Sequence, residues 1–219
     1  DFLYLKTATN FNFNLDELVS YFNDTTLLNE WQKTELALIV AMEYYSQNNN
    51  LIALNFLNSC CKESLIKSQD PIQLFKYGIL LERNDHIKES ENTIQKSIDI
   101  SNGSYPSILN YLAYLWVEND QNLDTAEKML VKAVDESNFQ DGAILDSLGW
   151  LYFKKNKIDL AEKWITQAYI MEPSEPEIID HLSQIYLQLN RIKESKFLDN
   201  KIILFHKDYF KYDEVFNRN

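Results

Sequence analysis

The sequence predicts an all-α protein built from successive pairs of antiparallel helices, and three observations support this. Apolar residues recur at helical spacing along most of the chain. Only four glycines and four prolines occur among 219 residues, which disfavours β-rich folds with many tight turns and suits helices joined by short corners. A small residue also recurs on every second predicted helix, at intervals of 37, 35, 36 and 34 residues: Ala41, Gly78, Ala113, Gly149 and Ser183. A plain helical bundle has no reason to repeat its pattern at this interval, so we expect about five repeats.

The N-terminal segment, residues 1–33, precedes the periodic region. Residues 1–14 are rich in aromatic residues and asparagine and show no clear period. We expect them to be the end of a preceding repeat or a strap that packs on the first helices. Residues 15–22 form a short amphipathic segment, with Leu15, Leu18 and Phe22 at helical spacing.

The first two predicted repeats cover residues 34–70 and 71–105. In the first, one helix carries a stripe of Leu36, Val40, Ala41 and Tyr44, and its partner carries Ala53, Leu57 and Cys60. The second opens at Asp70-Pro71, a typical N-cap followed by proline at the first helical position. Its second helix has the polar stripe Ser90, Ile94 and Ser97 and ends at Asn102-Gly103, which tolerate positive φ.

The remaining repeats are predicted at 106–141, 142–175 and 176–207, followed by a cap or tail at 208–219. The third contains a longer corner at 119–122, and the last runs on into apolar and charged residues. Since helix pairs that bury their faces by stacking need caps at the ends, we interpret residues 202–216 as a candidate cap helix. It mixes apolar and charged residues, as expected for one packed and one solvated face.

Residues 142–175 form the most complete unit. Its first helix carries Leu145, Leu148, Gly149 and Tyr152, and its second carries Ala161, Ile165, Ala168 and a closing Pro173. This pattern resembles the tetratricopeptide repeat, with Leu145 in place of the commoner Trp and Ile165 in place of Phe. The resemblance extends over most of residues 34–207 and implies a right-handed superhelical solenoid that acts in protein–protein interaction.

In the tetratricopeptide family, the first helices of the repeats (A helices) line a concave groove that binds partner segments. The matching positions form an aromatic strip edged with acids. The resemblance implies these groove residues: Met42, Tyr45, Ile79, Asn110, Tyr114, Asp146, Trp150, Phe153, Asp180 and Gln184. Some of them could instead pack against the next repeat; for Trp150 we expect exposure in the groove, because the packing positions of its helix are already filled.

A carboxylate-binding lysine clamp, known from chaperone-binding members of the family, is disfavoured here. The matching positions are Leu38, Phe75, Asn110, Asp146 and Asp180, and none is lysine. An acidic, aromatic groove favours an apolar or basic partner segment or helix.

Composition and motifs argue against other functions. A net charge of −12 disfavours nucleic-acid binding, and no apolar stretch is long enough to span a bilayer. No phosphate-binding glycine loop or nucleophile elbow occurs, and His86, His181 and His206 lack metal-ligand spacing. Cys60 and Cys61 are adjacent, which strains a disulfide, so we interpret them as buried or half-buried thiols. We therefore expect no catalytic residue, no metal and no cofactor.

Two alternatives to a scaffold for a foreign partner stay open. The array could assemble with copies of itself, or it could be the docking part of a longer enzyme. The motif Asp146-Ser147-Leu148-Gly149-Trp150, followed one repeat later by Asp180-His181-Leu182, resembles the C-terminal repeats of bacterial tetratricopeptide adaptors and lipoproteins, which favours the periplasm or cell envelope.

Overall fold

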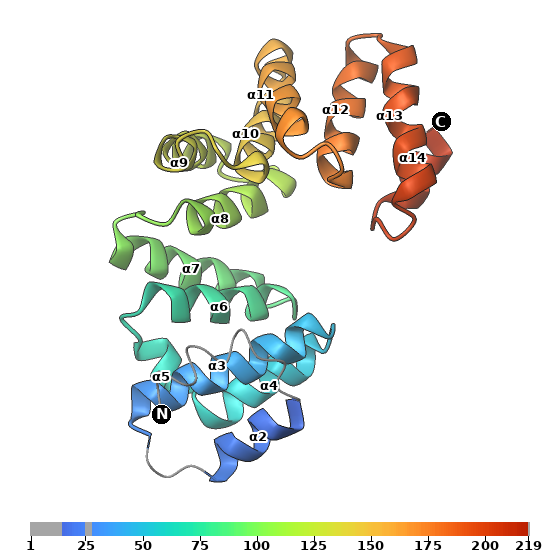
Figure 1. Ribbon diagram of the computed structural model, residues 1–219. Coiled ribbons are helices and arrows are strands. Elements are labelled where there is room, and N and C mark those ends of the chain that lie inside the picture. Colours follow the sequence, from blue (N-terminus) through green and yellow to red (C-terminus); the bar gives the residue numbers. More distant parts are fainter. Residues whose placement is uncertain (1–14, 25–27, 219) are drawn as a thin grey trace. The chain divides into compact units, whose positions relative to one another are not determined.

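The computed structural model describes residues 15–24 and 28–218 and is all-α over these ranges (Figure 1). The chain divides into two compact units, Asp1–Gly103 and Ser104–Asn219. The prediction of an all-α chain of antiparallel helix pairs is confirmed. The predicted strap at 1–14 lies outside the described residues.

Over residues 15–24 and 28–103, the first unit has two helix pairs, a preceding helix and one extra short helix. Its helices are α2 (Leu15–Asp24), α3 (Glu30–Ser46), α4 (Asn50–Cys60), α5 (Lys62–Lys67), α6 (Pro71–Glu82) and α7 (Ile87–Ser101). Helices α3 and α4 form the first pair, and α6 and α7 the second. The apolar stripes predicted for α3 and α4 are buried at Leu36, Val40, Ala41, Ala53 and Leu57. The sequence does not predict the short helix α5, whose Leu65 is fully buried and packs into the same core.

The end of α4 differs from the prediction. Cys60 is exposed and only Cys61 is buried, because the helix breaks between them before α5 begins. Both are free thiols.

Polar residues determine where α6 begins and how α6 and α7 pack together. The Asp70 side chain accepts hydrogen bonds from the backbone N–H groups of Ile72 and Gln73, which makes it the predicted N-cap. The polar stripe of α7 is buried because its hydroxyls find partners. Ser90 donates to the Gly78 carbonyl at 2.7 Å and Ser97 to the Pro71 carbonyl at 2.7 Å. These bonds cross between the two helices and satisfy groups that burial would otherwise leave without partners.

The second unit holds three helix pairs and a terminal helix. They are α8 (Pro106–Glu118) with α9 (Leu123–Glu136), α10 (Gly142–Lys154) with α11 (Ile158–Met171), α12 (Pro176–Gln188) with α13 (Ile192–Phe205), and α14 (Tyr212–Arg218). The first helix of each pair, α8, α10 and α12, is its A helix. Neighbouring A helices contact one another.

Small residues stand where paired helices approach most closely. A Cβ added to Gly149 on α10 would lie 2.3 Å from Ile165 Cγ1 and 3.0 Å from the Ile165 backbone nitrogen on α11. Gly78 shows the same closeness to Ile94, at 2.4 Å. The sequence repeat of small residues therefore marks real helix crossings.

Corners between helices are made mainly by asparagine and aspartate. The non-glycine residues with positive φ in the described ranges are Asn48, Asp85, Asn102, Asp120, Asn122, Asn138, Phe139, Asn156 and Asn190. Most lie one to three residues after the end of a helix. Asn and Asp adopt this backbone region more readily than other side chains, which explains how a chain with four glycines turns so often.

The C-terminal end differs from a single long cap helix. Helix α13 ends at Phe205, residues 206–211 form a connection, and α14 follows. Val215 of α14 is fully buried and Tyr209 of the connection is 6% exposed. The segment does cover part of the last pair, but as a turn followed by a short helix.

Candidate functional site

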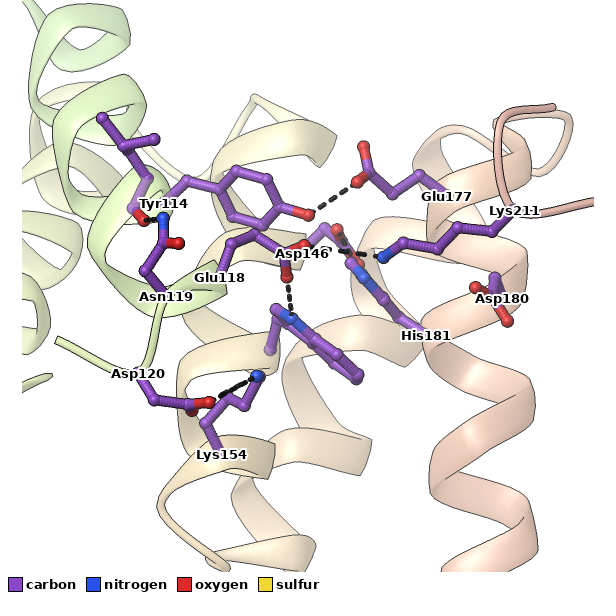
Figure 2. A network of polar contacts seen from close by, with 12 residues as sticks. Tyr114, Glu118, Asn119, Asp120, Asp146, Lys154, Glu177, Asp180, His181 and Lys211 are labelled. Atoms are coloured by element: carbon purple, nitrogen blue, oxygen red, sulfur yellow. Dashed lines mark hydrogen bonds and ion pairs between the residues drawn. The ribbon is translucent and has the colours of Figure 1, made fainter. Parts of the chain in front are cut away.

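Side chains of the three A helices of the second unit meet in one polar network. We call it the A-helix cluster. Six of its members are labelled in Figure 2: Tyr114 and Glu118 on α8, Asp146 on α10, and Glu177, Asp180 and His181 on α12. The seventh is Trp150 on α10. The cluster contains four carboxylates and one histidine, so its own composition is acidic.

Two bonds in the cluster start from aromatic side chains. The Tyr114 hydroxyl donates to Glu177 Oε1 at 2.6 Å, joining α8 to α12. The Trp150 indole N–H donates to Glu118 Oε1 at 2.6 Å, joining α10 to α8. Both bonds have a carboxylate acceptor, which makes them stronger than bonds between neutral groups.

Trp150 also forms the centre of an aromatic stack. Its ring lies 4.0 Å from the His181 ring, with an angle of 11° between the planes, and 4.6 Å from the Phe153 ring. Stacked between these partners, Trp150 is only 5% exposed. The expectation that Trp150 projects into an open groove is therefore wrong: its ring packs between repeats, because Glu118 and His181 of the flanking A helices offer it a partner and a stacking surface.

His181 is fully buried and bonds to one acid. Its Nδ1–H donates to Asp146 Oδ2 at 2.9 Å. Burial alone would lower the pKa of His181, but the charge and hydrogen bond of Asp146, helped by Glu177 and Asp180, raise the pKa above its ordinary value. The raised pKa widens the pH range over which the ring is protonated, and the ring lies against the face of Trp150, where a cation is stabilised.

The acids of the cluster converge on Tyr114. Burial raises the pKa of its hydroxyl far above the ordinary value, and Glu177, Glu118 and Asp146 raise it further. Carboxylates from all three A helices are therefore close enough to act on one side chain. The same concentration of negative charge attracts a cation.

Three buried polar atoms of this region have no partner within the described residues. They are Asn110 Oδ1 on α8, Asp146 Oδ1 on α10 and His181 Nε2 on α12. Buried polar atoms are nearly always bonded, either to protein groups or to ordered water. Two of the three are oxygen acceptors, which require a donor.

The C-terminal segment reaches the cluster with its own donors. The Tyr209 hydroxyl donates to Asp180 Oδ2 at 3.1 Å, and the Lys211 ammonium lies 3.5 Å from Glu118 Oε2. Arg218 bonds to Asp180 Oδ1 at 2.6 Å and to Asp199 Oδ1 at 2.7 Å. Figure 2 shows the Lys211 side chain extending towards Glu118 beside Asp146.

The predicted groove residues divide between the two units. Met42 and Tyr45 are half-buried and pack against the core of the first unit, and Ile79 on α6 is half-buried. In the second unit Tyr114, Asp146, Trp150 and Asp180 belong to the A-helix cluster, whereas Asn110, Phe153 and Gln184 are half-buried, and Phe153 stacks on Trp150. Leu38, which matches the first clamp position, is fully buried. Of the predicted residues of α8, α10 and α12, the structure thus brings together Tyr114, Asp146, Trp150, Phe153 and Asp180.

Sequence reasoning misses the partners of these residues. Glu177 is not among the predicted groove positions, and Tyr209, Lys211 and Arg218 fall in the predicted cap or tail. A signal is present, since residues 206–212 of this acidic chain concentrate aromatic residues together with lysine and histidine. Asp180 and His181, neighbours on one helix, bond to different partners, Arg218 and Asp146.

Potential metal ligands do not gather at one point in the described part of the chain. No group of three or more His, Cys, Asp or Glu residues is placed there to hold a metal. The buried His181–Asp146 contact is a structural ion pair inside the aromatic stack. Over the same residues, no helix has both the length and the apolarity needed to cross a bilayer.

Comparison with solved structures identifies the fold. A thermophilic tetratricopeptide-repeat protein of Thermus thermophilus aligns with a TM-score of 0.67 and 18% identity, over 84% of this chain and 99% of that one. PilW, a type IV pilus biogenesis factor, aligns with a TM-score of 0.66 and 11% identity, over 84% and 78%. YrrB, described as a tetratricopeptide-repeat protein with an unusual peptide-binding site, gives 0.56 and 14%, over 94% and 98%. No protein-family model matches the sequence, and no curated protein is significantly similar to it.

The chain therefore has the tetratricopeptide-repeat fold, and the resemblance seen in its sequence is confirmed at the level of the fold. This fold commonly serves as a scaffold for protein–protein interaction.

Proposed function

We propose that the protein is a non-enzymatic interaction scaffold, and that the A helices of its second unit bind a basic segment of a partner protein. The observation that supports this most directly is that Glu118, Asp146 and Glu177, one from each of three successive A helices, all bond to side chains of the same cluster. Acidic surfaces recognise basic partners by complementary potential, which gives specificity and fast association.

The buried acceptors Asn110 Oδ1 and Asp146 Oδ1 add to this argument. An ammonium or guanidinium group brings several N–H donors and a positive charge at once. A lysine or arginine side chain would thus satisfy both the bonding capacity and the charge of this region. Half-buried Phe153 and Gln184 at the edge of the cluster would contact the neighbouring part of the segment.

The test compares two labelled synthetic peptides by fluorescence anisotropy: a short amphipathic peptide carrying lysines, and its counterpart with glutamate at each lysine. We expect the lysine peptide to bind and the glutamate peptide not to bind. Glu118→Gln combined with Glu177→Gln should weaken its binding about tenfold or more, since each substitution removes a charge that the ligand would contact.

A matched control removes two charges elsewhere. Asp135→Asn with Asp159→Asn changes exposed acids on α9 and α11 and should leave the affinity nearly unchanged. Equal binding of both peptides, or an equal loss in the control, would show that general charge and not the A-helix cluster is responsible.

The self-assembling alternative makes a different prediction. If the array binds copies of itself through the same face, light scattering should show dimers at micromolar concentration that dissociate in the Glu118→Gln, Glu177→Gln variant. A monomer under those conditions argues against it.

A further inference from the structure

Residues 206–218 lie on the face that we propose for the partner. Tyr209 bonds to Asp180 of α12, and Lys211 pairs with Glu118 of α8. Arg218 fixes the far end of the segment, because it bonds to two buried carboxylates, Asp180 and Asp199. The segment thus contacts acids of the second unit with a hydroxyl, an ammonium and a guanidinium group.

The position of Lys211 is not explained by capping alone. A cap that only covered the last helix pair would contact α12 and α13, as Arg218 of α14 does. Lys211 instead extends to the end of α8, two helix pairs earlier (Figure 2). There it shares one carboxylate with Trp150, which bonds to Glu118 Oε1 while Lys211 lies near Oε2.

We propose that residues 206–218 are a built-in ligand of the A-helix cluster, and that a basic segment of the partner binds by displacing Lys211 and Tyr209 from Glu118 and Asp180. This inference rests on the proposed function and adds its regulation. The free protein holds its own lysine where the partner's lysine or arginine binds. Two cations cannot share Glu118 without repulsion, so occupancy by one opposes the other.

The connection at 206–211 is suited to such an exchange. It has no helical hydrogen-bond ladder of its own between α13 and α14, and the ion pair of its Lys211 with Glu118 is partly exposed. At 3.5 Å this contact is also longer than the 2.6 and 2.7 Å contacts of Arg218, so it is the weaker one and can break without unfolding the unit. The bonds of Arg218 to buried acids are stronger anchors, which would keep α14 attached while the connection moves.

The experiment uses the full chain and the labelled lysine peptide. The tail-weakened variant carries Lys211→Ala and Tyr209→Phe, which remove the ammonium and the hydroxyl but keep the buried ring. Its matched control carries Lys207→Ala and Tyr212→Phe, the same changes at residues of the same segment. We expect the tail-weakened variant to bind the peptide about tenfold more tightly than wild type, as when a site occupied nine-tenths of the time is freed, and the control to bind as wild type does.

A second measurement keeps the proposal testable if the variant is unstable. Hydrogen exchange of residues 206–211 in the wild-type chain should become faster when the peptide saturates the protein. Equal affinities of wild type and variant, or exchange that stays unchanged at saturation, would overturn displacement while leaving the proposed function intact. Absence of peptide binding to all three proteins would overturn both.

Discussion

His181 places an ionisable ring at the centre of the second unit. Because its pKa is raised in the folded state by Asp146, Glu177 and Asp180 against the opposing effect of burial, the folded protein binds its proton more tightly than the unfolded chain. The stability from this group is therefore fully present below the unfolded pKa of about 6.5 and is lost as the pH rises through the folded pKa.

This gives a pH prediction at the level of one residue. In wild type, the free energy of unfolding should fall as the pH rises from about 6.5 upward. His181→Gln should lack that fall, since it keeps an N–H donor for Asp146 and cannot titrate. Urea denaturation of both proteins between about pH 6 and 9 would measure the difference, in which titrations common to both cancel. Parallel pH profiles would show that His181 stays in one protonation state throughout.

For Trp150, the sequence predicts the position on its helix but not the burial of the side chain. Its position on α10 is correctly predicted from the repeat, but its burial depends on Glu118 and His181, which belong to the A helices before and after it. Helical periodicity describes one helix at a time. It contains no information on whether a neighbour supplies a carboxylate for the indole N–H.

The helices of a pair cross closely at the small residues. The crossing of α10 and α11 at Gly149 allows the clearest test of how much this closeness matters for stability. Gly149→Ala should lower the free energy of unfolding by about 1 to 2 kcal/mol. Overpacking costs about 1–3 kcal/mol, whereas the gain in helix propensity offsets at most about 1 kcal/mol. The new Cβ would meet both the side chain and the backbone of Ile165, so neither can simply rotate away.

Gly142→Ala on the same helix is the control for this prediction. Its added Cβ would meet Oε1, Cδ and Cγ of Glu172, the flexible end of an exposed side chain that can move. Chemical denaturation of the two variants should therefore differ clearly. Similar values for both would mean that the crossing adjusts more easily than its geometry indicates.

The elements themselves are predictable to different degrees. The register of the helix pairs follows from Gly78 and Gly149, whose crossings allow no larger residue without a shift, and the start of α6 follows from Asp70-Pro71. The polar stripe of α7 suggests that this helix packs weakly. Ser90 and Ser97 are nevertheless buried, because backbone carbonyls of α6 accept hydrogen bonds from their hydroxyls. The break at 206–211 is not predicted, since the apolar spacing continues through it.

On the scale of the molecule, the chain consists of two compact units. The second holds three helix pairs, a terminal helix and the whole A-helix cluster. About three stacked repeats are needed for a stable array. We therefore expect residues 104–219 to fold alone, with helical circular dichroism and one cooperative urea transition.

A shorter fragment provides the comparison for this expectation. Residues 142–219 lack α8 and α9 and so lose the partners of Glu177, Trp150 and Lys211, namely Tyr114 and Glu118. It should unfold at a clearly lower urea concentration, or fail to give a cooperative transition. Equal midpoints would indicate that the bonds between α8 and the later helices add nothing to stability.

The corners built from asparagine and aspartate have a consequence for the unfolded chain. Glycine at these positions would relieve the strain of positive φ, but it would also give the unfolded polypeptide more conformations to lose on folding. Residues such as Asn102 and Asn156 accept a small local strain and keep the denatured ensemble smaller. The chain thus changes direction at many residues that each have less conformational entropy than glycine. These turns define the array, and they also reduce the conformational entropy that the chain loses on folding.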